Sequence, residues 1–384
     1  MADWAPSAGF DAYLDNSPSD QVNEITPTDL TLMSALGWIS TSETTGSGQT
    51  FVVSAGQTGN ELAVQSGGIV AVLSGGTALD TVISNGGLVT VDGLAVATLI
   101  AGGLETVDSG GVAHGATISS GGEQDIDGTA SGGEIFGWAV DVMSGGAYSS
   151  STDFAGAVTN IFAGGIADHL VLSNGGQINV LGTVTSNVTV SGGGLMVISS
   201  GGVVSGALGF GTGVHGGTVD VQSGGKFSFF TDFAGGETDI AAGGIASHLS
   251  VSSGGVVDLM GTITNNVAVF AGGLEVISSG GVQTGQSGSG TGISGGTIDV
   301  LSGGELDHAT VSSGGTLDVS AGGTIHNIAV SNGGILLLQG ALTNNYTVFS
   351  GGTLTAGSRA SQVAASSAMV VLRPSMAQPR GPQC

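Results

Sequence analysis

Two stretches of this chain are near copies: "SGGAYSSSTDFAGAVTNIFAGGIADHL" begins at Ser144, and "SGGKFSFFTDFAGGETDIAAGGIASHL" begins at Ser223, which sets a 79-residue interval. A second motif recurs at the same interval, since "LGTVTSNVTV" at Leu181 returns as "MGTITNNVAV" at Met260 and "QGALTNNYTV" at Gln339. A fixed period of this kind indicates an array of stacked units rather than a globule with one closed core. We call the 79-residue unit the superrepeat.

The superrepeat contains Gly-Gly pairs at alternating steps of 8 and 11 positions, which together predict a coil of about 19 residues. Between the pairs, apolar residues such as Ile298 and Val300 alternate with polar ones such as Thr297 and Asp299, which is the period of a β-strand. Glycine accepts positive φ, so the pairs mark turns. One coil cannot bury its own apolar face, but coils stacked about 4.8 Å apart can. The sequence therefore predicts an all-β fold, a parallel β-helix or solenoid of roughly 16 coils.

The chain divides into three zones. Residues 1–48 are predicted to be an N-terminal segment with one short helix, starting at Thr28 and stopped by Gly37, followed by a polar linker. Residues 49–356 are the predicted solenoid array. Residues 357–384 contain no Gly-Gly pair and three of the four basic residues, and are predicted to be a disordered tail.

The charge of the chain excludes two classes of partner. There are 29 acidic and only 4 basic residues, giving a formal net charge of −25. Such a surface repels nucleic acid and anionic lipid headgroups, whereas it is compatible with divalent cations. The single cysteine, Cys384, excludes internal disulfides and thiolate metal clusters. No signal peptide and no transmembrane helix is recognisable.

Acidic residues recur with the spacing of one coil and are the main candidate site. The candidate metal ligands are Asp220, Asp239, Asp258, Asp299 and Asp318. Their counterparts one superrepeat before the first three are Asp141, Asn160 and Asn179. In a 19-residue coil these side chains stack on one face, where carboxylates repel unless a cation such as Ca²⁺ binds them. The alternative interpretation is a solvated face that keeps the array soluble and blocks lateral aggregation.

The remaining residue patterns give little support for a catalytic site. Paired carboxylates can serve glycosidases or lyases, but such sites also need basic residues, and the array contains only Lys226 and no arginine. We therefore predict no catalytic residues and no cofactor apart from the calcium alternative. Aromatic residues either fill gaps in the interior or form a sugar-stacking patch, and these are Phe136, Trp138, Phe229, Phe230 and Phe270.

The repeats resemble the AIDA-type repeats of bacterial autotransporter adhesins, whose units read like "SGGTLDVSAGGTIHNIAVSNGG" from Ser313 to Gly334. The resemblance covers residues 62–356. It implies a passenger, or part of one, at the outer-membrane surface of a Gram-negative bacterium or outside the cell. It also implies O-glycosylation of repeat Ser and Thr by a glycosyltransferase. The segment "GFDAYLDNSPSDQVNEITPTDLTLMSALGW" from Gly9 is similar to the end of secreted metallopeptidase-like domains, without their H-E-x-x-H motif.

The predicted function is that of a non-enzymatic repeat protein, surface-displayed or secreted, acting in adhesion, in self-association or as a stalk. Its predicted partners are surface glycans or proteins, or further copies of the chain, engaged by many weak patches at once. Two alternatives remain open from the sequence: a carbohydrate-active β-helix enzyme, and a spacer from a larger secreted protease-like protein.

Overall fold

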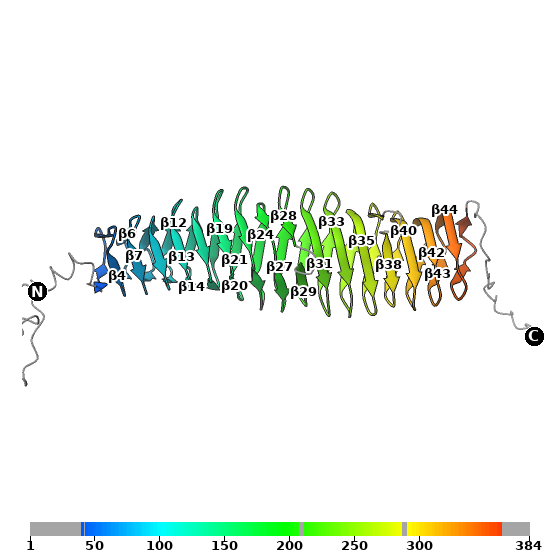
Figure 1. The fold of residues 1–384 in the computed structure, drawn as a ribbon, viewed down its shortest axis with the longest axis horizontal. Coiled ribbons are helices and arrows are strands. Elements are labelled where there is room, and N and C mark those ends of the chain that lie inside the picture. Colours follow the sequence, from blue (N-terminus) through cyan, green and yellow to red (C-terminus); the bar gives the residue numbers. More distant parts are fainter. Residues whose placement is uncertain (1–39, 42, 207–210, 286–289, 363–384) are drawn as a thin grey trace, which may run out of the picture. The chain divides into compact units, whose positions relative to one another are not determined.

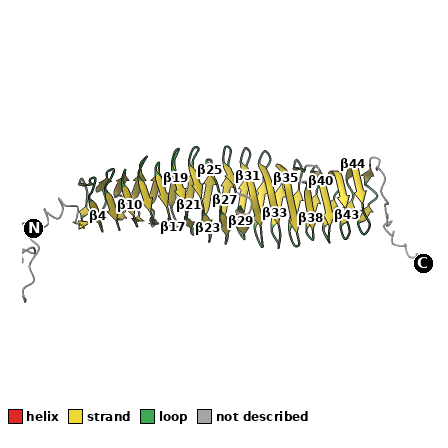
Figure 2. Cartoon of the chain, in the orientation of Figure 1, coloured by secondary structure: helices red, strands yellow, loops and turns green. Residues whose placement is uncertain are grey.

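A computed structural model describes residues 40–41, 43–206, 211–285 and 290–362. The chain forms two compact units that divide between Ser131 and Gly132. Each unit is built from strands, with no helix among its described residues, and in each the strands stack as coils of a parallel β-solenoid (Figures 1 and 2). The predicted fold class is confirmed. The helix predicted after Thr28 lies outside the described residues. Of the tail predicted at 357–384, residues 357–362 are described and end in strand β46 (Ser361–Gln362), so strands extend past residue 356; the remainder lies outside the described residues.

Each coil contributes one strand to one sheet, sheet B, and one bent strand or two short strands to a second sheet, sheet A. Sheet B of the first unit contains β3 (Thr50–Val53), β6 (Ile69–Val72), β9 (Leu88–Val91), β12 (Leu104–Val107) and β15 (Glu123–Ile126). Its sheet A contains β1 (Ser40–Thr41), β2 (Thr44–Thr45), β4 (Thr58–Asn60), β5 (Ala63–Val64), β7 (Thr77–Leu79), β8 (Val82–Ser84), β10 (Leu94–Val96), β11 (Leu99–Ala101), β13 (Val112–His114), β14 (Thr117–Ser119) and β16 (Thr129–Ser131). Strands β1 and β2 therefore precede residue 49, where the array was predicted to begin.

The second unit has the same construction. Its sheet B contains β18 (Ala139–Val142), β21 (Val158–Ile161), β24 (Gln177–Val180), β27 (Leu195–Ile198), β30 (Thr218–Val221), β32 (Glu237–Ile240), β34 (Val256–Leu259), β36 (Leu274–Ile277), β39 (Thr297–Val300), β41 (Thr316–Val319), β43 (Ile335–Leu338) and β45 (Thr353–Ala356). Its sheet A contains β17 (Glu134–Phe136), β19 (Ala147–Ser149), β20 (Thr152–Asp153), β22 (Ile166–Asp168), β23 (Val171–Leu172), β25 (Thr183–Val184), β26 (Thr189–Ser191), β28 (Val203–Ser205), β29 (Thr212–His215), β31 (Lys226–Asp232), β33 (Ile245–Val251), β35 (Thr262–Phe270), β37 (Val282–Thr284), β38 (Thr291–Ser294), β40 (Glu305–Ser312), β42 (Thr324–Val330), β44 (Ala341–Val348) and β46 (Ser361–Gln362).

The register between coils explains the superrepeat. Thr218 pairs with Glu237, and Glu237 pairs with Val256, so these are two 19-residue coils. The next two coils differ, since Val256 pairs with Leu274 in an 18-residue step and Leu274 pairs with Thr297 in a 23-residue step. These four steps complete the 79-residue period. The predicted 19-residue coil therefore describes two of the four coils of a period, and the first unit also contains a 16-residue coil, from Leu88 to Leu104.

The two residues of a Gly-Gly pair are required for different reasons. Gly175 has φ +90°, a left-handed conformation that side chains rarely adopt, but it faces open space. Gly176 lies against the preceding coil, where an added Cβ would lie 2.5 Å from the carbonyl oxygen of Asp153. Positive φ, the reason predicted from the sequence, accounts for the first glycine only. The second is set by close contact between coils.

A left-handed residue also bends each long strand of sheet A. Phe229 in β31 has φ 58°, and this bend changes which side chains face inward. Phe227 and Phe230 are both buried, with their rings stacked 4.0 Å apart, although one position is odd and the other even. Strict alternation would have placed Phe229, not Phe230, in the interior.

The aromatic residues named from the sequence fall into two groups. Phe230 fills the interior, where it is 2% exposed. Phe136, Trp138 and Phe270 are exposed on the surface, at 46%, 55% and 47%. Interior gap filling is therefore the role of only part of this set. The remainder of the interior is mostly Val, Ile and Leu, such as Val219 and Val221 of β30.

Candidate functional site

The predicted acidic column exists and lies on the outer side of sheet B. Asp220 of β30 pairs with Asp239 of β32, and Asp239 pairs with Asp258 of β34. Each occupies the outward position between two buried residues of its strand. Stacking of coils therefore brings three carboxylates into adjacent rungs of one ladder.

A fourth acid belongs to the same cluster. One carboxylate oxygen from each of Glu237, Asp239 and Asp258 lies within 4.8 Å of the others, close enough to hold one cation. Sequence reasoning missed Glu237, although it stands two positions before Asp239 on one strand and must share its face. Partial burial, together with Glu237, Asp258 and Asp220 nearby, raises the pKa of Asp239 to about 6.

The column is not continuous over all five predicted aspartates. Val276 of β36 occupies the rung between Asp258 and Asp299. Asp299 and Asp318 therefore form a separate pair on β39 and β41. Partial burial and the neighbouring carboxylate of Asp318 raise the pKa of Asp299. Calcium binding at either acidic group stays a proposal, and a solvated face accounts equally well for this geometry.

The first superrepeat relieves the same repulsion with amides. Asn160 donates to Asp141 at 2.8 Å, and Asn179 donates to Asn160, also at 2.8 Å. Gln177 completes the chain by donating to Asn179 at 2.8 Å. An amide ladder thus occupies the place that carboxylates occupy one superrepeat later, and it needs no cation to satisfy its oxygens.

This contrast predicts the effect of Asp239→Asn, which copies Asn160. At pH 7 the variant should be more stable by up to about 1 kcal/mol, because like charges are removed from a solvent-screened face. The wild-type pKa is raised by folding, so its carboxylate becomes protonated, and the penalty fades, as pH falls through about 6. The difference should therefore shrink by pH 5 in urea denaturation.

Asn160→Asp is the matched reciprocal change, because it places a carboxylate beside Asp141 in the amide ladder and should lower stability at pH 7. A wild type more stable than Asp239→Asn at pH 7 would contradict the repulsion argument. If that excess stability appeared only with millimolar calcium, it would instead support a bound cation.

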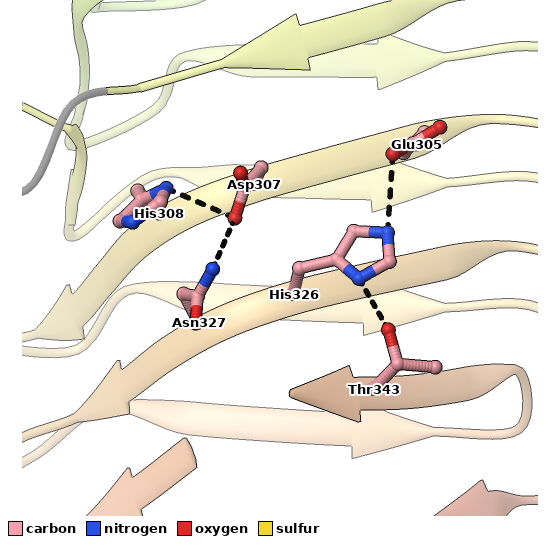
Figure 3. A network of polar contacts seen from close by, with 6 residues as sticks. All are labelled: Glu305, Asp307, His308, His326, Asn327 and Thr343. Carbon is pink, nitrogen blue, oxygen red and sulfur yellow. Dashed lines mark hydrogen bonds and ion pairs between the residues drawn. The ribbon is translucent and has the colours of Figure 1, made fainter. Parts of the chain in front are cut away.

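A second polar cluster spans three coils of sheet A (Figure 3). His326 of β42 contacts Glu305 of β40 through Nε2 at 3.1 Å and Thr343 of β44 through Nδ1. Beside it, Asp307 accepts from Asn327 at 2.8 Å, and its carboxylate lies 2.9 Å from Nδ1 of His308. The cluster links adjacent coils outside the backbone ladder.

The order hydroxyl, imidazole, carboxylate in Thr343, His326 and Glu305 is that of a nucleophilic triad. Here, however, the three residues lie on the outer face of paired strands, whose backbone N–H groups are committed to the ladders between β40, β42 and β44. In this described region the ladder leaves no pair of N–H groups to stabilise an oxyanion. We interpret the cluster as a set of non-covalent side-chain contacts that join adjacent coils.

The interior holds acids that the sequence analysis did not single out. Asp153 and Asp232 occupy equivalent positions in successive superrepeats, and both are fully buried. Thr238 donates to Asp232 at 3.0 Å, while the second carboxylate oxygen of Asp232 has no hydrogen-bond partner. Burial raises the pKa of Asp153 to about 7 and that of Asp232 to about 8.

A third interior acid, Glu275, lies beside the amide of Gln283, which in turn accepts from the hydroxyl of Thr291 at 2.7 Å. Burial raises the pKa of Glu275 to about 8. These acids, and Glu105 of the first unit, which is equally buried, are closed off from solvent by the stacked coils, so they cannot reach a substrate. The buried acids instead make the stability of the fold depend on pH.

Stacked parallel coils, Gly-Gly turns and surface ladders define this chain as a parallel β-solenoid repeat protein. Comparison with protein-family models and with curated proteins gives no match. Among solved structures, the chain is similar to the crystal structure of a TibA fragment, hyper-glycosylated in a reaction catalysed by TibC. The identity is 29%, the alignment covers 84% of this chain and 100% of the fragment, and the TM-score is 0.57. Within the described residues, no helix is long and apolar enough to cross a membrane.

Proposed function

We propose that this chain is a non-enzymatic β-solenoid, displayed at or released from the bacterial surface, that acts in adhesion or self-association. The observation that carries the proposal is the in-register stacking of coils, which brings equivalent outward positions of successive coils side by side, as in Asp220, Asp239 and Asp258. Weak contacts made by repeated patches add through effective concentration. The similarity to the TibA fragment and the resemblance to AIDA-type repeats support it.

Removing one superrepeat tests this function. Deleting residues 160–238 joins Thr159 to Asp239, which reproduces the native junction of Thr238 and Asp239 and keeps the register of the coils. Beads carrying the full chain should aggregate or adhere to cells. Beads carrying the shortened chain at equal density should do so more weakly, by at least several-fold, because fewer patches are presented.

Three outcomes separate the alternatives. Beads that neither aggregate nor adhere at any density would contradict adhesion and leave a stalk or spacer. Full activity of the shortened chain would contradict multivalency. Release of reducing ends from polysaccharides by the purified chain would favour a carbohydrate-active enzyme, which the flat acidic faces and the single lysine of the array disfavour.

A second proposal concerns modification. Serines that precede Gly-Gly pairs are exposed at the turns after sheet B, and their hydroxyls lie over the first glycine of the next coil, as in Ser144, Ser223 and Ser302. The TibA fragment was hyper-glycosylated. We propose that these serines are acceptors for an O-glycosyltransferase.

Co-expression with TibC should add hexose- or heptose-sized increments to the intact mass. Changing Ser144, Ser223 and Ser302 to alanine should remove increments in proportion. Peptide mapping that places the sugars at other residues, or an unmodified chain, would overturn the assignment.

A further inference from the structure

The outer face of sheet A in the second unit contains a groove of about 700 Å³. Its floor consists of outward-facing residues in five successive coils, each paired in register with the next: Gly213, Thr231, Ser250, Ala268 and Gly292. The groove therefore runs across the strands, along the direction in which the coils stack. Its volume is within the range of sites that bind small molecules.

Aromatic rings line both long sides of the groove. On one side, Phe229 and His248 occupy the bends of β31 and β33, with ring centroids 4.4 Å apart. Asn266 follows on the same side. On the other side, Phe233 stacks against His215 with centroids 4.4 Å apart. The ends are at Gly211 and Gly290, in the two 23-residue coils.

The groove is uncharged in a strongly acidic chain. Its lining includes no Asp, Glu, Lys or Arg, and His248 is its one titratable side chain. The net charge of −25 repels anions, and the absence of carboxylates from the lining gives cations nothing to bind. An occupant suited to this surface is neutral.

The backbone beneath the groove is already fully paired. Strand β33 is hydrogen-bonded to β31 on one side and to β35 on the other. An extended peptide cannot add to this sheet, because strand addition needs a free edge. The occupant must instead contact side chains: the stacked rings at the sides, the hydroxyls of Thr231 and Ser250 on adjacent rungs about 4.8 Å apart, and the amide of Asn266.

We infer that this groove binds a neutral oligosaccharide that lies along the coil stack. Phe229 and Phe233 contact its apolar C–H faces, while Thr231, Ser250 and Asn266 hydrogen-bond to its hydroxyls. One sugar ring advances by a distance comparable with one coil, so successive rings meet successive floor residues. The inference deepens the proposed adhesive function and rests on it, by naming the class of ligand and the place where it binds.

The first test uses the wild-type chain. It has six histidines, so their imidazole proton signals can be followed by NMR. Titration with maltotetraose, cellotetraose and β-1,4-mannotetraose should shift the His248 signal saturably for at least one of them. His169 is the matched control, because it occupies the same bend position one superrepeat earlier and does not line the groove.

The second test fills the groove. Ser250→Trp and Ala268→Trp should each weaken binding of the responsive tetrasaccharide at least tenfold. Ala329→Trp is the control, since Ala329 has the equivalent outward position on β42 and does not line the groove. Far-UV circular dichroism and thermal unfolding verify that each variant is folded. If one groove variant fails to fold, the other variant and the wild-type titration still test whether the groove binds the tetrasaccharide.

Several results would overturn the inference: no shift of His248 with any of the three tetrasaccharides, an equal shift of His169, or equal weakening by Ala329→Trp. Bead adhesion separates the two proposals. Adhesion without tetrasaccharide binding overturns the groove as a saccharide site and leaves the proposed function intact. Tetrasaccharide binding without adhesion supports the groove as a saccharide site and contradicts the proposed adhesive function.

Discussion

Gly176→Ala is expected to destabilise the second unit by about 3 kcal/mol, because the new methyl group meets backbone rather than a movable side chain. The ideal Cβ position is 2.5 Å from the carbonyl oxygen of Asp153 and 3.0 Å from its Cβ. Relief requires the coils to separate and weakens the ladder on both sides. A fall in the urea midpoint, and faster amide exchange in β20 and β24, should report the change.

The neighbouring glycine provides the control. Gly175→Ala introduces a left-handed alanine into open space and should cost about 1–2 kcal/mol. Gly175→Asn should cost less, because asparagine tolerates this conformation, as Asn174 does with φ 51°. Equal losses for Gly175→Ala and Gly176→Ala would show that conformation alone, and not contact between coils, sets both positions.

The second large effect is a dependence of stability on pH. Folding raises the pKa of Asp232 from 3.8 to about 8. Between about pH 4 and 8 the unfolded chain has lost this proton while the folded chain keeps it, so stability falls by about 1.4 kcal/mol per pH unit for such a group. Asp153 and Glu275 act in the same direction. The chain should therefore unfold more readily at pH 8 than at pH 5.

The third superrepeat offers the test, because it has Val311 and Leu317 where the second has Asp232 and Thr238. The double variant Asp232→Val, Thr238→Leu should be more stable than wild type at pH 8, on the order of 3 kcal/mol, with a gain that shrinks toward pH 5. The reciprocal variant Val311→Asp should lose stability at pH 8 and recover part of it at pH 5. A gain of the double variant independent of pH would mean that packing, not ionisation, is responsible.

Much of the architecture is readable from sequence because the repeat is exact in length. The 79-residue interval, the glycine pairs and the alternation in segments such as Thr297–Val300 predicted parallel stacking and the ladder of Asp220, Asp239 and Asp258, and the register confirms both. The sequence analysis missed the 18- and 23-residue coils because the 8- and 11-residue glycine steps describe only the two 19-residue coils of each period.

The sequence analysis missed the interior acids for a different reason. In "KFSFFTD" from Lys226, strict alternation places Phe227, Phe229 and Thr231 on one side. The left-handed bend at Phe229 shifts the phase by one residue, so Phe230 and Asp232 turn inward instead. The groove depends on the same bend, which carries Phe229 to its side. A residue of this kind has no sequence signature, because serine, histidine, asparagine and phenylalanine all occupy it.

At the left-handed bend of sheet A, the side chain differs between superrepeats whereas the strand register does not. Ser150, Phe229 and His308 stand at one equivalent bend in three superrepeats, with φ between 56° and 58°, and the strands around them keep their register. Each superrepeat thus has a further outward-facing side chain at this bend that differs while the register of the coils stays the same. The surface of such a solenoid can diversify one bend at a time, without a new fold.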